Sequence, residues 1–248
     1  METTYSVIVQ ARCSSNRLPG KVLADICGKP MLLRQVQRLS YYLNFLPVIV
    51  ATSTDSTDDP IEELCIKENV SCFRGDLHNV MERFIHCADQ MNIDYIIRVG
   101  GDDPLIDPMC CEHLYQYHLK YGGDFLYASH KDGWPYGAAA ELIKVDALKK
   151  IYAKTQQKLY LEHTIPYFFD HPDEFIISKI MVEAKLHRPN FYFSVDYRED
   201  LELVRKIFHY FVEKKNNEYF KFNELIDYLD ENPDLFLINK GLHCGFER

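Results

Sequence analysis

The first half of the chain alternates short apolar runs with stretches of helical periodicity, and this alternation restricts the fold more than any other feature. Strands are expected at residues 5–10, 47–52, 72–74 and 94–99, with helices between them at 31–43, after Asp59-Pro60 and at 79–91. Strands separated by helices of about 10–15 residues predict βαβ units and a mostly parallel sheet. Right-handed crossovers place the loops after these strands at one edge of the sheet, where ligands bind.

The second half has a less regular pattern. Strands are expected at 125–129, 141–145 and 191–195, and helices at 159–170, 198–213 and 222–230. Residues 174–183 alternate in polarity, which favours an exposed or partner-contacting strand. Another helix is expected to open at Asp107-Pro108, with Asp107 as its N-cap.

Composition excludes several classes of protein. In 248 residues, 47% are hydrophobic and 26% charged, which is typical of a globular chain. The net charge of −9 argues against broad nucleic-acid binding, which needs a basic face. No stretch approaches the roughly 20 apolar residues that span a bilayer, and no targeting segment is recognised, so no membrane association and a cytoplasmic location are expected. The eight cysteines contain no Cys-x-x-Cys pair, so reduced thiols are expected.

A basic loop follows the first strand. It holds the cations Arg12, Arg17 and Lys21 together with the small residues Ser14 and Ser15. Cationic side chains and backbone N–H groups that a ligand can approach closely make a cradle for a polyphosphate. The loop matches neither a Walker loop nor a dinucleotide-binding fingerprint. A solvated basic loop is the alternative interpretation.

Acidic residues follow the strand at 94–99. Gly100 and Gly101 would let a ligand approach, and Asp102 comes directly after them. A carboxylate in this place suits Mg²⁺, which takes one or two carboxylates plus phosphate oxygens, whereas a simple turn is the alternative. Asp196 would complete such a site if it lay near Asp102. Its own alternative is structural, as the N-cap of the next helix in a capping box with Glu199.

Six segments of the chain match the motifs of one family. They are residues 10–21 (QARCSSNRLPGK), 50–64, 73–84 with its FRG and NVMERF elements, 101–108 (GDDPLIDP), 162–167 with Glu-His and Pro-Tyr, and 194–203. On these motifs the chain resembles the spore-coat polysaccharide (SpsF-type) cytidylyltransferases, which are related to the acylneuraminate and 3-deoxy-manno-octulosonate cytidylyltransferases. The resemblance covers nearly the whole chain.

The resemblance implies a Rossmann-like, GT-A-like nucleotidyltransferase fold, an α/β/α sandwich of three layers with a mostly parallel sheet. It implies a single domain, 1–248, in which 1–125 bind the nucleotide and 126–248 bind the acceptor and form a homodimer. The implied reaction transfers CMP from CTP to a sugar acid or a similar acidic or phosphorylated acceptor. Pyrophosphate is released, Mg²⁺ is the cofactor, and the product serves cell-surface or spore-coat polysaccharide biosynthesis.

The resemblance also implies roles for particular residues. Arg12 and Lys21 would bind the triphosphate with Arg17 nearby, and Asp102 and Asp196 would bind Mg²⁺, Asp102 also being catalytic. The acceptor would contact Glu141 and His163. The nucleotide pocket would be formed by small residues and one cation, namely Ala11, Ser14, Ser15, Thr52, Arg74, Gly75 and Gly101.

The chain departs from the family pattern at four positions. Ser14 replaces a glycine, Asp103 a cysteine, Ala139 an acidic residue and Leu161 an arginine. The last two lie in the half expected to bind the acceptor, and they favour a non-catalytic relative as one of two alternatives that stay open. A nucleotide-sugar-dependent glycosyltransferase would be expected to carry Asp-x-Asp, whereas the two aspartates here are adjacent. A non-catalytic relative would bind CTP without releasing pyrophosphate.

Overall fold

The computed structural model describes residues 3–243, so Cys244 and the rest of the C-terminal tail lie outside the described residues. These residues form a seven-stranded sheet in the order β5-β4-β1-β6-β8-β7-β9. The strands β5, β4, β1 and β6 are parallel, β8 runs antiparallel to both β6 and β7, and β9 is parallel to β7. In chain order they are β1 (Tyr5–Gln10), β4 (Val48–Ser53), β5 (Ser71–Gly75), β6 (Tyr95–Gly100), β7 (Phe125–Tyr127), β8 (Glu141–Lys144) and β9 (Ile177–Lys179).

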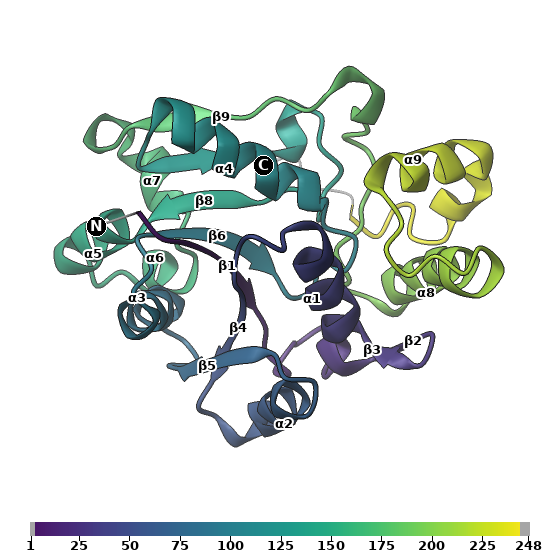
Figure 1. The fold of residues 1–248 in the computed structure, drawn as a ribbon, viewed down its shortest axis with the longest axis horizontal. Coiled ribbons are helices and arrows are strands. Elements are labelled where there is room, and N and C mark those ends of the chain that lie inside the picture. The colour runs from purple at the N-terminus through teal and green to yellow at the C-terminus, as the bar shows by residue number, and fades with distance from the viewer. Residues whose placement is uncertain (1–2, 244–248) are drawn as a thin grey trace.

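Helices cover both faces of the sheet (Figure 1). One face packs against α3 (Val80–Met91), α5 (Val145–Lys154), α6 (Lys158–Glu162) and α7 (Pro166–Asp170). The core on the other face includes α1 (Met31–Tyr42), α2 (Asp59–Lys67), α4 (Pro108–Tyr121), α8 (Arg198–Phe208) and α9 (Phe222–Glu231). The predicted mostly parallel sandwich of three layers is therefore confirmed.

Short elements connect these layers. A small hairpin of β2 (Asp25–Ile26) and β3 (Lys29–Pro30) precedes α1, and α8 continues as a π-helical stretch over His209–Lys214. Single 3₁₀ turns occupy Lys21–Leu23, Ser56–Asp58, His130–Asp132, Pro172–Glu174, Ala184–Leu186 and Pro233–Leu237. No helix within residues 3–243 is long and apolar enough to cross a membrane.

The first-half elements form for the reasons that their sequence suggests. Val7 and Val9 pack on one face of β1 and Ile8 on the other, as in a parallel strand buried on both sides. The N-caps of two helices are ordinary side-chain caps: Asn79 accepts a hydrogen bond from the Glu82 N–H (3.1 Å), and Asp107 accepts one from the Met109 N–H (3.0 Å).

Several second-half predictions are wrong. Residues 191–195 form no strand and contribute one bridge, between Tyr136 and Tyr192, because no neighbouring strand pairs with this buried segment along its length. The predicted helix at 159–170 is divided into α6 and α7, since Pro166 offers no N–H to continue the first. The alternating segment at 174–183 reduces to the edge strand β9. Helix α5 follows β8 without a break and was not predicted.

Candidate active site

One cavity of about 540 Å³ opens where β1 and β6 end. Its walls come from the basic loop after β1, the loop after β6, the start of β8 and the segment before α8. These segments are far apart in the sequence, and the prediction that the two loops meet at one edge of the sheet is confirmed. The predicted residues that line this cavity are Arg12, Ser15, Arg17, Lys21, Asp102, Glu141, His163 and Asp196.

The basic loop is held against the body of the protein through its backbone. The Cys13 N–H donates to the buried Asp58 carboxylate (2.6 Å), and the Gly20 N–H donates to the Cys13 carbonyl (2.9 Å). Gly20 adopts a φ of 71°, in the left-handed region that favours glycine, and the chain then enters the 3₁₀ turn at Lys21–Leu23. This reversal turns Lys21 inward, where its side chain is only 7% exposed.

The loop after β6 touches the end of β1 directly. The Gly101 N–H donates to the Gln10 carbonyl at 2.7 Å, and a Cβ at Gly101 would lie 2.8 Å from that same oxygen. The side-chain amide of Gln35 on α1 donates to the Gly100 (2.6 Å) and Asp103 (2.8 Å) carbonyls. Gly101 is thus required for packing of the two loops, and Gly100 rather than Gly101 lines the cavity.

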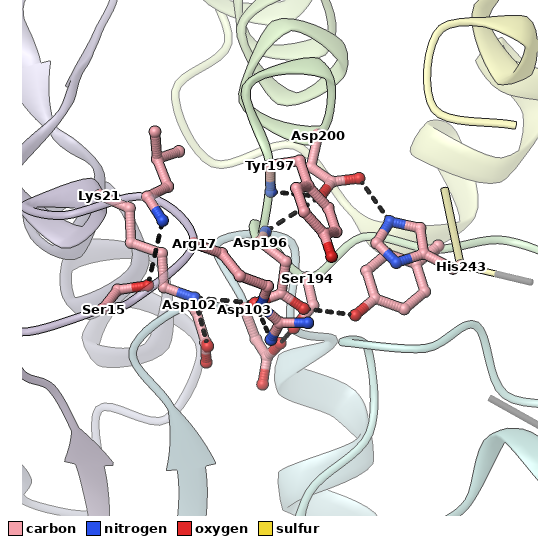
Figure 2. A network of polar contacts seen from close by, with 12 residues as sticks. Ser15, Arg17, Lys21, Asp102, Asp103, Ser194, Asp196, Tyr197, Asp200 and His243 are labelled. Carbon is pink, nitrogen blue, oxygen red and sulfur yellow. Dashed lines mark hydrogen bonds and ion pairs between the residues drawn. The ribbon is translucent and has the colours of Figure 1, made fainter. Parts of the chain in front are cut away.

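A cluster of opposite charges lies at the centre of the cavity (Figure 2). The Lys21 ammonium donates to Asp102 Oδ2 (2.8 Å) and Asp196 Oδ1 (3.0 Å), and Arg17 pairs with Asp196 Oδ1 at 2.6 Å. Burial acts to lower the pKa of Lys21, but the two carboxylates raise it above its ordinary value. Burial acts to raise the pKa of Asp196, but the Tyr192 hydroxyl, Lys21 and Arg17 lower it. Lys21 is therefore a cation held between two carboxylates.

Asp103 lies beside this cluster and was not predicted as a site residue. It accepts a hydrogen bond from the Ser194 hydroxyl, and a Cβ at Gly137 would lie 3.0 Å from its Oδ1. Loss of water around the carboxylate, and then the charge of Asp102, raise the pKa of Asp103 to about 8. At neutral pH this carboxyl is therefore largely protonated, and the charge of Asp102, the residue before it, favours that state.

A polar row crosses the sheet next to the cluster. Arg98 on β6 and Glu141 on β8 are register partners whose side chains pair at 3.0 Å. Tyr127 on β7 is the next register partner of Glu141, and Gln10 ends β1. Burial raises the pKa of Glu141, and Arg98 opposes that shift. All four side chains line the cavity, so this part of its wall is a charged pair between two uncharged polar groups.

The remaining predicted nucleotide residues do not line this cavity. Ser14 is exposed, Ala11 and Thr52 are buried beneath the loops, and a Cβ at Gly75 would meet the Arg83 side chain at 2.8 Å. Arg74 lies on the far side of β4, where it pairs with Asp59 (2.7 Å) and Glu62 (2.6 Å) of α2. Because Glu62 binds Arg74, it does not form a capping box at the start of α2.

The structural alternative for Asp196 is wrong. The N-cap of α8 is Tyr197, and Asp200 rather than Glu199 accepts from the backbone there, with bonds from the N–H groups of Asp196 (3.0 Å) and Tyr197 (2.8 Å). The Asp196 side chain points instead to Lys21 and Arg17, and it is 4% exposed.

Other cavity residues were missed by sequence reasoning. For Gln10 and Arg98 a signal existed, because each is a polar side chain within an otherwise apolar strand, which is costly unless a partner or a ligand satisfies it. Tyr136, Gly137 and Ser194 come from irregular segments and gave no such signal.

Comparison with known proteins agrees with this geometry. A family model described as cytidylyltransferase matches residues 6–229. The spore coat polysaccharide biosynthesis protein SpsF of Bacillus subtilis (strain 168) is 30% identical over 92% of this chain and 94% of its own length. A 3-deoxy-manno-octulosonate cytidylyltransferase of Actinobacillus succinogenes is 33% identical over 48% of this chain and 46% of its own.

Solved structures extend the similarity to three dimensions. A cytidylyltransferase of Leptospira borgpetersenii superposes with a TM-score of 0.88 at 27% identity, covering 94% of this chain and 97% of that one. A CMP:2-keto-3-deoxy-manno-octonic acid synthetase complexed with CTP gives 0.64 at 18% identity, covering 83% and 98%, and shares the fold. The family match over most of the length, together with the cationic loop and facing carboxylates at the sheet edge, shows that this chain belongs to the cytidylyltransferase family of CTP-dependent nucleotidyltransferases.

Proposed function

We propose that this enzyme transfers CMP from CTP to a sugar acid or a similar acidic or phosphorylated acceptor and releases pyrophosphate. The observation that carries the proposal is the position of Lys21, which lies between Asp102 and Asp196 in a cavity that Arg12 and Arg17 also line. A triphosphate needs cations on its oxygens, and a bound divalent ion needs carboxylates. The cavity supplies both the cations and the carboxylates, in direct contact with one another.

The donor half of the reaction would use the basic loop. Arg12 and Lys21 would hold the β- and γ-phosphates, and Arg17, 43% exposed at the cavity mouth, would stand near them. The acceptor oxygen would bond to the α-phosphorus while the bond from that phosphorus to the pyrophosphate oxygen breaks. The leaving oxygens gain charge as this happens, and cations already in place stabilise that charge without reorganisation. No nucleophilic side chain is required.

The carboxylates fit Mg²⁺ as the cofactor. Within residues 3–243 no group of three or more His, Cys, Asp and Glu side chains is arranged to hold a metal ion, but Mg²⁺ at phosphates needs only one or two carboxylates. Asp102 and Asp196 meet this need, because they already share one cation, the Lys21 ammonium. When bound, Mg²⁺ would neutralise phosphate charge and orient the α-phosphate. Lys21 would then be available to the phosphates.

The acceptor would lie over the polar row. Arg98 donates a hydrogen bond from Nη1 to Glu141, and its planar guanidinium retains further N–H donors for an acidic group of the acceptor. Glu141 and His163 would accept from or donate to hydroxyl groups on either side. Relatives named for spore coat polysaccharide biosynthesis and for 3-deoxy-manno-octulosonate support a sugar acid and a role in polysaccharide biosynthesis. Use of CTP would place the reaction in the cytoplasm.

A homodimer would use the second half of the chain. β9 is an edge strand of three residues, and the apolar side chains of Ile176 and Met181 beside it are 66% and 61% exposed. A second copy packed on this edge would cover both side chains and the open backbone groups. Sedimentation of the purified protein tests this arrangement, and a monomer at micromolar concentration would contradict it.

The glycosyltransferase alternative has no support in the site. Asp102 and Asp103 are adjacent rather than spaced as Asp-x-Asp, and Lys21 binds the first whereas Ser194 donates to the second. The decisive experiment measures pyrophosphate release with Mg²⁺ and each of the four nucleoside triphosphates, against sugar acids, sugar phosphates and phosphonates. Release with CTP and one acceptor is expected. CTP binding by calorimetry with no release for any acceptor would favour the non-catalytic relative.

A further inference from the structure

The C-terminal segment after α9 folds back onto the active site. It lies beyond residues 6–229, which the family model matches. A 3₁₀ turn at Pro233–Leu237 begins it, and there the ring of Phe236 stacks on Phe191 with centroids 3.7 Å apart. The chain then brings Asn239 into the protein interior, where it is 6% exposed, and ends the described part at His243.

Asn239 and His243 contact the same two residues, and we call this pair the latch. The Asn239 amide donates to the Tyr192 carbonyl (3.1 Å) and to Asp200 Oδ1 (2.9 Å). The imidazole Nε2 of His243 lies 2.8 Å from the same carboxylate oxygen, and its ring stacks on Tyr192 with centroids 3.3 Å apart and planes inclined by 10°. The latch thus fixes both the ring and the backbone of Tyr192.

Both residues that the latch holds are bonded to Asp196. The Tyr192 hydroxyl donates to Asp196 Oδ2 at 2.7 Å, and Asp200 Oδ2 accepts from the Asp196 backbone N–H at 3.0 Å. Figure 2 shows these connected contacts: Lys21 and Arg17 contact Asp196 on one side, and Asp200 and His243 lie on the other. The side chain and the backbone of Asp196 are therefore each connected to the latch by one intermediate residue.

These contacts decide where the second oxygen of Asp196 points. Because Asp196 is only 4% exposed, little solvent reaches its carboxylate to replace the Tyr192 hydroxyl if that ring moves. With Oδ2 held by Tyr192, Oδ1 must face the cavity and its cations. Partners of this kind, which bind a ligating side chain rather than the ion, typically change metal affinity or activity by about 10–100-fold.

We propose that Asn239 and His243 position Asp196 for the divalent ion and the phosphates, so that the C-terminal segment is part of the active site although it contacts no substrate. The inference rests on the proposed function, in which Asp196 is an ion ligand. The latch residues are positioning residues. Their removal is expected to weaken ion binding and slow turnover while leaving the sheet and its core folded.

The test compares full-length variants at one position. His243→Ala removes the hydrogen bond and the stacking, His243→Phe retains only a stacking ring, and His243→Gln retains only a donor. Lys240→Ala is the matched control, because this exposed lysine lies in the same segment outside the network. Mn²⁺ binding is measured by electron paramagnetic resonance with a CTP analogue whose α- and β-phosphorus atoms are joined by a methylene group. The melting temperature, kcat and the KM for CTP are measured alongside.

His243→Ala is expected to weaken Mn²⁺ binding about tenfold and to lower kcat by a similar factor. The Gln and Phe variants should each recover part of the loss, and Lys240→Ala should match the unaltered protein. Wild-type Mn²⁺ affinity in His243→Ala overturns the inference. A lowered melting temperature with unchanged Mn²⁺ affinity also overturns it, because the segment would then be structural only.

A double-mutant cycle tests the route through Tyr192. Tyr192→Phe keeps the ring under His243 but removes the hydroxyl that holds Asp196. If the latch acts through that hydroxyl, His243→Ala should weaken Mn²⁺ binding less in the Tyr192→Phe background than alone. Full additivity overturns this route. Failure of the proposed function is a separate result, since it would appear as unaltered enzyme that binds Mn²⁺ and nucleotide but releases no pyrophosphate.

Discussion

Replacing Lys21 by methionine removes the charge at the centre of the site while keeping an unbranched side chain of similar length. The side chain is 7% exposed, so its methylene groups stay packed and the change is confined to the ammonium. Asp196 loses one of three donors but keeps Arg17 and Tyr192. Asp102 loses its ion pair with Lys21, but 37% of its side chain is exposed and water can replace the cation.

The cost to stability follows from these partners. Loss of one charged hydrogen bond on the buried Asp196 is worth about 1.5–3 kcal/mol, and loss of the solvent-screened pair with Asp102 at most about 1 kcal/mol. Roughly 2–3 kcal/mol in a chain of this length lowers the melting temperature by about 5–10 °C. Urea denaturation monitored by circular dichroism measures the free energy of unfolding directly.

The effect on activity should be much larger than the effect on stability. If Lys21 meets charge that develops on the leaving pyrophosphate, its removal should lower kcat by about 10²–10³, as loss of one charge-stabilising donor does elsewhere. The assay is pyrophosphate release at a temperature where the variant is folded, with Lys206→Met on the surface of α8 as the control. A kcat within threefold of the unaltered enzyme would refute a role for Lys21 on the phosphates.

Three other changes test separate parts of the site. Asp102→Asn should lower turnover at least about 100-fold at saturating Mg²⁺ without unfolding the protein, and near-normal turnover would exclude it as an ion ligand. Asp103 binds a proton more tightly in the folded protein, so its contribution to stability falls as pH rises from about 4 to its folded pKa of about 8. The melting temperature of Asp103→Asn, minus that of the unaltered protein, should therefore be higher at pH 8 than at pH 5. Equal differences at the two pH values would contradict this. Arg98→Ala should raise the KM for the acceptor about tenfold or more and leave the KM for CTP unchanged, whereas a parallel rise in both would place Arg98 on the nucleotide.

The sequence predicted the elements that its local patterns determine. In β1, β4 and β6 the apolar runs have the length of a strand and are bounded by polar loops. The predicted strands therefore match the observed ones, and the loops after them are placed correctly. Residues 191–195 have an equally apolar pattern, yet they have no neighbouring strand to pair with along their length. Strand formation depends on such a partner, and a local pattern cannot reveal whether one is present.

Arg74 shows a different limit of prediction from sequence. It lies in a motif that matches the family, and its residue type suits a phosphate. In the structure two carboxylates of α2, Asp59 and Glu62, are one turn apart and hold the guanidinium away from the cavity. Residue type and family motif predict what a side chain can bind, but the competing partner is supplied by a helix that packs only in the folded chain.

The two ends of the cavity differed in how far they could be predicted, because one comes from continuous stretches of sequence and the other from scattered single residues. The end proposed for the phosphates comes mostly from two contiguous loops, so its cations and Asp102 appear in compact motifs, and only Asp196 is added from a distant segment. The end proposed for the acceptor takes single side chains from four strands and from irregular segments. Arg98 and Glu141 become partners only because β8 is antiparallel to β6 in that register. A one-residue change of register would turn Glu141 to the opposite face of the sheet. If the acceptor binds here as proposed, its recognition depends on the pairing of β6 with β8. Exchanging the charges of Arg98 and Glu141 should then change acceptor choice, measured by pyrophosphate release, more than a substitution in the loops does.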